Sequence, residues 1–324
     1  MKKATIKDVA KEAKVSISVV SYVLNDTDGV SISAETKERV HNAAKKLNYV
    51  SNRIARGLRE QKSMCIGVIP YWDFDVRIFT EILDGINREA MANGYRLILC
   101  SANGSSDFDY LDCFNAKNID GAVFIAPPEG SVAVDETVHI HTMLENNLPF
   151  VLINGHTNIE GVSYINFDFY SAAYTATKVL IQKGHADITY VTPDTDYFET
   201  MERLRGYTDA VKARGLTPNI CPIGEVANEI KTFRAVVTNK SDTAHSVMKE
   251  ALRQGLNIPN DFVLISGNTE AYCSYLFPSL SSIKIPARKM GAAAAKLLID
   301  KLNNKADFVL PQLEYSVQYR ESTG

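Results

Sequence analysis

The sequence predicts an α/β protein: a small all-α module at the N-terminus, followed by two lobes that are each built on a doubly wound parallel sheet. Up to about residue 50, apolar residues recur at the three- and four-residue spacing of amphipathic helices. From Met64 the pattern changes to short apolar runs that alternate with longer amphipathic stretches, which is typical of βαβ units. A chain of 324 residues is also long enough for two or three folding units.

Two short helices with a tight turn between them are expected from Thr5 to Asn25, which reads TIKDVAKEAKVSISVVSYVLN. Thr5 and Asp8 have the spacing of a capping arrangement, and Ser16 can cap the second helix. A short exposed helix on a small helical core fits the major groove of DNA, as in a helix-turn-helix module. An ordinary helical hairpin is the alternative on these residues alone. Because residues three and four apart are neighbours on a helix, the outer face of the second helix is expected to hold Ile17, Ser18, Ser21 and Tyr22.

A third amphipathic helix, expected over Ser33–Leu47, is followed by a short basic stretch, residues 51–59, which reads SNRIARGLR. Residues 1–62 contain thirteen Lys or Arg against seven Asp or Glu, a net charge of +6, whereas the remainder of the chain carries −9. Basic charge gathered on a small N-terminal module is what contact with phosphates requires. A solvated surface is the alternative interpretation of the same charges.

The order of these parts resembles the headpiece of the LacI/GalR family of bacterial transcription regulators. The matching phrases are VAKEAKVSISVVSYVLN, VSISAETKERVHNAAKKLNYVSN and RIARGL, and the resemblance continues through Gly324. It implies a repressor that binds a near-palindromic operator as a dimer, with a hinge helix whose apolar wedge, Leu58, enters the minor groove. The predicted DNA contacts are Thr5, Ser16, Ile17, Ser18, Ser21, Tyr22, Asn25, Asn52, Arg53, Ala55, Arg56 and Leu58. A dimer is favoured over a tetramer because no leucine-rich heptads follow the core.

Two positions of the second helix differ from the common pattern of that family. Tyr22 stands where relatives commonly have Arg, and Val19 stands where they commonly have Thr. Arg can bridge O6 and N7 of guanine, whereas Tyr cannot form that fork. We therefore predict an operator that depends less on that guanine, with apolar contacts from Tyr22 or Ile17 to thymine methyl groups.

Beyond residue 62 the strands and helices of two lobes are expected in alternation. In the first lobe the strands are Cys65–Pro70, Arg96–Cys100, Gly121–Ile125 and Phe150–Ile153, and the helices are Phe79–Ala92, Tyr110–Ala116 and Val138–Glu145. The second lobe is expected to begin with a strand over Ser163–Phe167. It continues with Ala172–Lys183, Ile188–Val191, Glu202–Ala213, Ala235–Thr238, Thr243–Arg253 and Phe262–Ile265. The chain then returns to the lobes through a tail over Leu280–Ile285, a helix over Ala287–Leu302 and a strand over Leu313–Tyr319.

The resemblance implies a periplasmic-binding-protein-like (type I) core, carried by the phrases INFD (165–168), LIQKGH (180–185), RLRGY (203–207) and YREST (319–323). We expect a headpiece over residues 1–50, a hinge over 51–62 and a core over 63–324 that binds an effector and forms the dimer. Within the core, the first lobe is expected to comprise about 63–162 and 286–316. The second lobe is expected to comprise about 163–285 and 317–324.

The cleft between the lobes is where relatives bind their effectors, and the resemblance directs Arg203 into it; a helix-surface arginine is the alternative. Relatives usually have carboxylates at the positions that are occupied here by Asn154, by the pair Asn239-Lys240 and by Asn268. This loss disfavours a plain sugar, and an anionic ligand such as a sugar phosphate, another metabolite or a protein co-regulator remains open. Aromatic side chains near the end of the first strand can stack on a ligand or pack in the core. The predicted effector contacts are Tyr71, Phe79, Asn154, Arg203, Asn239, Lys240 and Asn268.

Other functional classes find little support in the sequence. The cysteines Cys65, Cys100, Cys113, Cys221 and Cys273 are scattered, without CxxC spacing, which favours reduced thiols in a cytoplasm over disulfides or zinc. There is no G-x-S-x-G, G-x-x-x-x-G-K or H-E-x-x-H motif. We therefore expect no enzyme activity, cofactor or metal. No signal peptide or membrane-spanning run is expected, which disfavours a secreted solute receptor.

Overall fold

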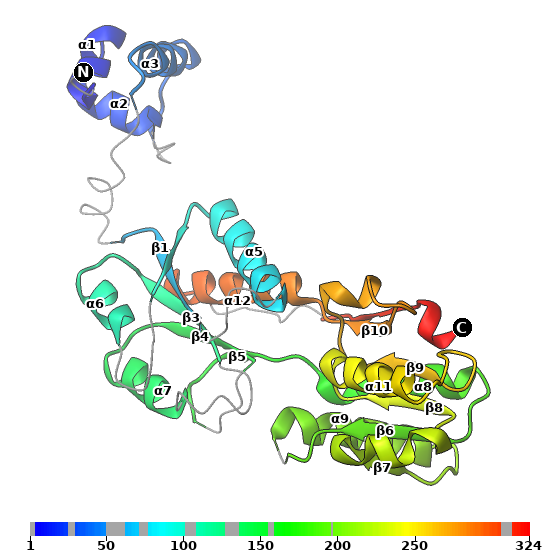
Figure 1. Cartoon of the computed structure of the whole chain (residues 1–324). Helices are drawn as coiled ribbons and strands as arrows, with labels where there is room; N and C mark the ends of the chain where they lie inside the picture. Colours follow the sequence, from blue (N-terminus) through cyan, green and yellow to red (C-terminus); the bar gives the residue numbers. More distant parts are fainter. Residues whose placement is uncertain are drawn as a thin grey trace. The chain divides into compact units, whose positions relative to one another are not determined.

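The computed structural model describes residues 4–24, 30–49, 62–70, 77–100, 108–126, 136–154, 159–195, 197–305 and 313–324. The chain divides into two compact units, Met1–Ser63 and Met64–Gly324 (Figure 1). Several predicted functional residues lie outside the described part of the chain: Asn25, Asn52, Arg53, Ala55, Arg56, Leu58 and Tyr71.

The first unit contains the helices α1 (Ile6–Ala13), α2 (Ile17–Leu24) and α3 (Ala34–Lys46). They pack around a core in which Val9, Val20 and Val40 are fully buried. The predicted caps are confirmed. The Thr5 hydroxyl donates to Asp8 Oδ2 at 2.7 Å, and Ser16 Oγ accepts the N–H of Val19 at 3.2 Å.

The first lobe of the second unit is a parallel sheet in the order β2-β1-β3-β4-β5. Its strands are β1 (Cys65–Pro70), β2 (Arg96–Leu99), β3 (Gly121–Ile125), β4 (Phe150–Ile153) and β5 (Tyr164–Ile165). Val68 and Val123 contribute to the cluster that includes side chains of α5 (Arg77–Ala92) and α12 (Ala287–Leu302). Phe124 contributes to the cluster on the other face, with α6 (Asp109–Asn115) and α7 (Glu136–Glu145) (Figure 1). This alternation of buried side chains is what a sheet covered on both faces requires.

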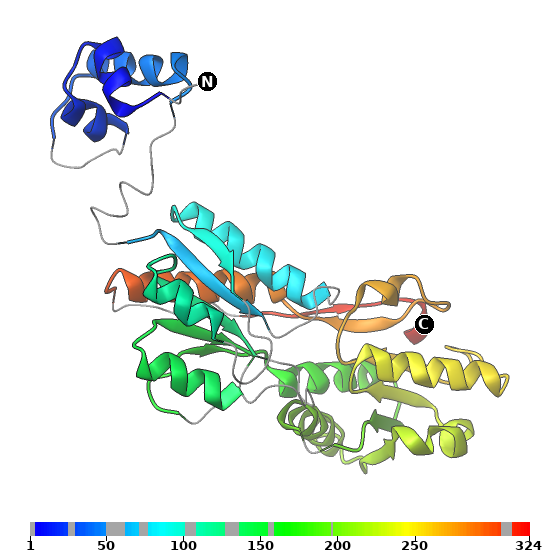
Figure 2. The same cartoon turned by 60° about the vertical axis from the view of Figure 1, so that its left-hand side comes forward.

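The second lobe repeats the strand order of the first and adds an edge strand, as β11-β10-β9-β8-β6-β7. Its parallel strands are β6 (Ile188–Thr192), β7 (Asn219–Pro222), β8 (Ala235–Thr238), β9 (Val263–Ser266) and β10 (Ser281–Lys284). The edge strand β11 (Ser316–Gln318) pairs antiparallel with β10, and Figure 2 shows it alongside that strand. One face packs on α8 (Phe169–Gln182) and α9 (Phe198–Lys212), and the other on α10 (Val226–Glu229) and α11 (Ser241–Arg253). Short 3-10 helices complete the lobe: η1 (Ile223–Glu225), η2 (Ile230–Thr232), η3 (Ala271–Ser274) and η4 (Glu321–Thr323).

The predicted α/β class and the two doubly wound lobes are confirmed, with one correction at the point where the chain changes lobe and one inside the second lobe. The strand expected to open the second lobe is β5, which pairs with β4 and therefore belongs to the first sheet. The change of lobe follows Ile165 and precedes α8. The strand β7 was not expected, because Asn219–Pro222 has no continuous apolar run. Within the described residues, no helix has the length and apolar character needed to cross a membrane.

Candidate functional site

The outer face of α2 is the exposed surface of the first unit that the sequence singled out. Ile17 is 44% exposed and Ser18 is exposed, whereas Ser21 and Tyr22 are half-buried. Val20 and Val23 on the opposite face are buried against α1 and α3. The capped, two-turn helix therefore presents a small polar and aromatic surface on a rigid support.

A cavity of about 440 Å³ opens between the two lobes of the second unit. Polar residues that follow β4, β8 and β9 reach it, which is where open α/β sheets bind ligands. Its volume suits a small metabolite. Residues of both lobes line it: Ile78, Ile82, Asn154, Phe167, Phe169, Glu199, Arg203, Lys240, Ser241, Asp242, Asn268, Glu270, Ala271, Tyr272, Ile285 and Met290.

A cluster of charged side chains lies in this cavity, centred on Glu199 in the first turn of α9. Glu199 Oε2 pairs with Arg203 Nη1 at 3.3 Å and with Lys240 Nζ at 3.2 Å. Asn154 Nδ2 donates to Glu199 Oε1 at 3.0 Å. We refer to these four residues as the Glu199 cluster. It brings one residue of the first lobe into contact with three of the second.

The pKa of Glu199 reflects two opposing effects. Burial alone would raise the pKa of this carboxyl group. The positive charges of Arg203 and Lys240, together with hydrogen bonds from Lys240 and Asn154, outweigh burial and lower the pKa below its ordinary value. Glu199 is therefore ionised at neutral pH, so that two cations share one anion.

The remaining walls of the cavity are aromatic, apolar and polar. The Phe169 ring lies 4.3 Å from the guanidinium carbon of Arg203, and it meets Phe167 edge to face at 5.3 Å. On the other side, the Tyr272 hydroxyl donates to Ser241 Oγ at 3.0 Å, and Asn268 Oδ1 accepts the Ser241 N–H at 2.7 Å. Such a surface can hold a flat or apolar body while its polar groups orient the ligand.

The structure brings together four of the residues proposed for the effector, namely Asn154, Arg203, Lys240 and Asn268. Two others lie elsewhere. Phe79 is fully buried in the core. Asn239 is 1% exposed and accepts a hydrogen bond from the Tyr190 hydroxyl at 3.2 Å. Phe79 and Asn239 therefore support the fold instead of lining the cavity.

The central role of Glu199 was missed by the sequence analysis, as were the contributions of Phe169 and Tyr272. One signal was present, since Glu199 precedes Arg203 by four residues, the spacing at which opposite charges meet on a helix. The aromatic residues gave no such signal. Their positions in the cavity depend on how α8 and η3 meet the rest of the lobe.

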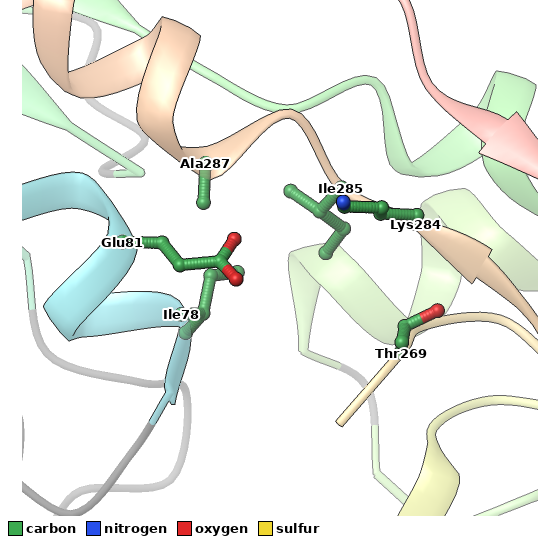
Figure 3. Close-up of a pocket in the computed structure, with 6 residues that line it drawn as sticks. All are labelled: Ile78, Glu81, Thr269, Lys284, Ile285 and Ala287. Carbon is green, nitrogen blue, oxygen red and sulfur yellow. The ribbon is translucent and has the colours of Figure 1, made fainter. Parts of the chain in front are cut away.

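A second cavity of about 20 Å³ lies beside the connection between β10 and α12, with room for about one water molecule. Figure 3 shows Glu81 extending from α5 into this space, opposite Thr269, Lys284 and Ile285. Its size makes it too small for an effector. Throughout the described chain, His, Cys, Asp and Glu side chains form no group of three or more that is suited to a metal ion.

Comparisons with known proteins agree with both parts of the chain. Residues 5–52 match the model for bacterial regulatory proteins of the lacI family, and residues 177–323 match a periplasmic binding protein-like domain. The transcriptional regulator RegA of Clostridium saccharobutylicum is 29% identical over 338 residues, covering 98% of this chain and 99% of RegA. The transcriptional repressor PurR of Aliivibrio fischeri is 30% identical over 322 residues, covering 93% of each chain.

Solved structures support the same fold. The lac repressor dimer bound to operator and the anti-inducer ONPF has a TM-score of 0.75 at 21% identity, covering 99% of each chain. The complex of the transcriptional regulator CelR with cellobiose has a TM-score of 0.66 at 22% identity, covering 98% of this chain and 99% of CelR. Together with the helix-turn-helix module and the cleft, the sequence relatives establish that this chain belongs to the LacI family of bacterial transcription regulators.

Proposed function

We propose that the chain represses transcription by binding a near-palindromic operator as a homodimer, under the control of an effector in the cleft. The observation that carries this proposal is the outer face of α2, which is held on a capped three-helix core at the size that fits a major groove. A basic module of net charge +6 supports it, because DNA phosphates attract such charge.

Base recognition is assigned to the α2 face, with direct contacts from Ile17, Ser18, Ser21 and Tyr22. Thr5 and Ser16 cap α1 and α2, so both lie at helix N-termini, which favour phosphates. Asn25 and the hinge residues Asn52, Arg53, Ala55, Arg56 and Leu58 complete the proposed interface. Leu58 would act as a minor-groove wedge that bends the duplex.

A homodimer is supported by exposed apolar side chains on the second lobe. Leu252 is 81% exposed, Tyr275 is 85% exposed and Phe277 is 96% exposed. Burial of apolar side chains against a partner is favourable, and a symmetric dimer gives two reading heads for two half-sites. We propose that a second copy of this chain covers them.

The cleft is proposed as the effector site, with Asn154, Arg203, Lys240 and Asn268 among the contacts. The related CelR was solved with cellobiose and the lac repressor with ONPF, which supports a small metabolite, here with an acidic group such as a sugar phosphate. A protein co-regulator is the alternative. We propose that the protein works in the cytoplasm, without enzymatic activity or a cofactor.

The test is selection of genomic DNA fragments by the purified full-length protein, with and without a panel of sugars, sugar phosphates and nucleobases. We expect enrichment of fragments that share a near-palindromic site, and loss of that enrichment in Ser18→Ala/Tyr22→Ala. The control is Glu38→Gln, which changes an exposed residue of α3 and should retain enrichment. Equal binding to all fragments under every condition would overturn the proposal. The dimer surface is tested by sedimentation velocity. Phe277→Ser should lower the fraction of dimer, whereas Tyr164→Ser, which changes another exposed aromatic residue, should leave it unchanged.

A further inference from the structure

The Glu199 carboxylate is held from both lobes of the cleft. Asn154, which follows β4 in the first lobe, donates to Oε1, whereas Arg203 and Lys240 of the second lobe both pair with Oε2. One side chain therefore makes the kind of contact between lobes that a ligand bound in the cleft would make.

The first-lobe end of this link is fixed by the backbone. Asn154 adopts φ = +58°, a left-handed conformation that Asn tolerates better than most residues. Its N–H donates to the carbonyl oxygen of Ile165 in β5 at 3.1 Å. At the other end, Arg203 is restrained by stacking on Phe169. The carboxylate thus bridges two supports that are each positioned by their own lobe.

The charge balance explains why a carboxylate occupies this position. The side chains of Arg203 and Glu199 are only 2% and 9% exposed, and that of Lys240 is 32% exposed. Buried cations are strongly destabilising without a counter-ion. Glu199 supplies that negative charge from within the second lobe.

The contact is also one that a ligand can replace. Glu199 reaches Arg203 through one nitrogen at 3.3 Å, longer than the roughly 2.7–2.9 Å typical of charge-assisted hydrogen bonds. In the described part of the chain, Arg203 Nε has no hydrogen-bond partner. A phosphate or carboxylate group presents several oxygens and can satisfy more of these donors.

We propose that Glu199 is a resident counter-ion of the cleft, which joins the lobes and competes with the anionic group of the effector. This deepens the proposed function and rests on it. The effector is accordingly a phosphate- or carboxylate-bearing metabolite, because a neutral hydroxyl group cannot supply the charge that Arg203 and Lys240 lose when Glu199 is displaced.

The first test is calorimetric titration of the full-length protein with inorganic phosphate, succinate and glucose. Glu199→Gln removes the competing charge at nearly constant size, and we expect it to bind phosphate or succinate at least tenfold more tightly than wild type. The phosphate and succinate arms identify which acid the cleft prefers, and glucose should show no such gain. The control is Glu202→Gln, which lies on the same helix and pairs with Arg205 at 2.7 Å on the outside. Unchanged or weaker anion binding by folded Glu199→Gln overturns the proposal.

The second test addresses the link between lobes and does not depend on Glu199→Gln being stable. Asn154→Gly removes the first-lobe partner without strain at φ = +58° and leaves Glu199 between its cations. We expect a larger radius of gyration by X-ray scattering without anion. An unchanged radius of gyration overturns the proposal that Glu199 joins the two lobes. DNA selection by wild type tests the proposed function separately, so failure of either proposal can be recognised on its own.

Discussion

Asn154 and Glu199 are 45 residues apart in sequence, and the amide nitrogen of one donates to the carboxylate of the other at 3.0 Å. This hydrogen bond joins the end of β4 to the first turn of α9, so it connects the two lobes at the wall of the cleft. Because the same carboxylate neutralises Arg203 and Lys240, a change at Glu199 should affect both stability and ligand preference.

The pH dependence of stability should reveal this carboxylate. Its pKa is lowered in the folded protein, with burial opposed by the charges of Arg203 and Lys240. It therefore stabilises the fold above the unfolded pKa of about 4.3, and this contribution is lost as pH falls through the lower folded pKa. At pH 7 we expect the free energy of unfolding of Glu199→Gln to be lower than that of wild type by on the order of 3 kcal/mol.

The measurement is urea unfolding followed by circular dichroism from pH 7 to pH 3.5. The difference between wild type and Glu199→Gln should shrink below about pH 4.3, because the carboxyl group of the unfolded wild-type chain takes up a proton there, while that of the folded protein does so only at lower pH. Glu202→Gln is the control, with an exposed ion pair to Arg205 and a small effect. A difference that stays constant across this range would contradict the assignment.

Packing of α8 against α9 should be sensitive to Gly206. A Cβ atom at this position would lie 2.2 Å from the carbonyl oxygen of Tyr170, which is backbone and cannot move aside cheaply. We expect Gly206→Ala to lower the free energy of unfolding by roughly 1–3 kcal/mol or more. Gly224→Ala is the matched control, because a Cβ there would meet nothing within 4 Å. Similar unfolding midpoints for the two variants would show that the helices can separate without cost.

The sequence predicted elements well where a local pattern sets both ends, and less well where the chain changes lobe. The strand Cys65–Pro70 and the helix Ala287–Leu302 were predicted to the residue, from a continuous apolar run and from a helical pattern after Pro286. The phrase RLRGY also has a physical explanation. Arg203 lines the cavity, Gly206 allows α8 to approach, and the Tyr207 hydroxyl donates to the Ile188 carbonyl oxygen at 2.7 Å.

The charge arrangement of the site could not be predicted from local pattern alone. Lys240 and Asn154 meet Glu199 because β4, α9 and the segment before α11 converge in three dimensions. The loss of carboxylates was noted from the sequence, but the residue that supplies the negative charge lies on a different element. The placement of β5 in the first sheet likewise depends on its pairing with β4, which two residues of strand do not specify.

Thiol reactivity should distinguish buried from accessible cysteines. Burial, with a smaller effect of the negative charge of Glu229, raises the pKa of Cys221 to about 12, and its side chain is fully buried. Because the thiolate is the reactive form, we expect no alkylation of Cys221 by iodoacetamide at pH 8 in the native protein. Half-buried Cys65 and Cys113 should react first, and Cys221 should react as well in urea. Peptide mass spectrometry measures this, and rapid native labelling of Cys221 would indicate opening of the second lobe.

Recognition by α2 should change when Tyr22 is replaced by Arg. Tyr22 is half-buried on the outer face of the helix, and its ring can contact thymine methyl groups but cannot bridge O6 and N7 of guanine. We expect Tyr22→Arg to gain roughly 1–3 kcal/mol of discrimination in favour of guanine at the contacted position. A base-by-base binding scan of the selected operator with both proteins measures the difference. Tyr22→Phe serves as the control, since it keeps the ring and should retain the wild-type preference. Wild-type protein that already requires guanine at that position would show that another residue makes the contact.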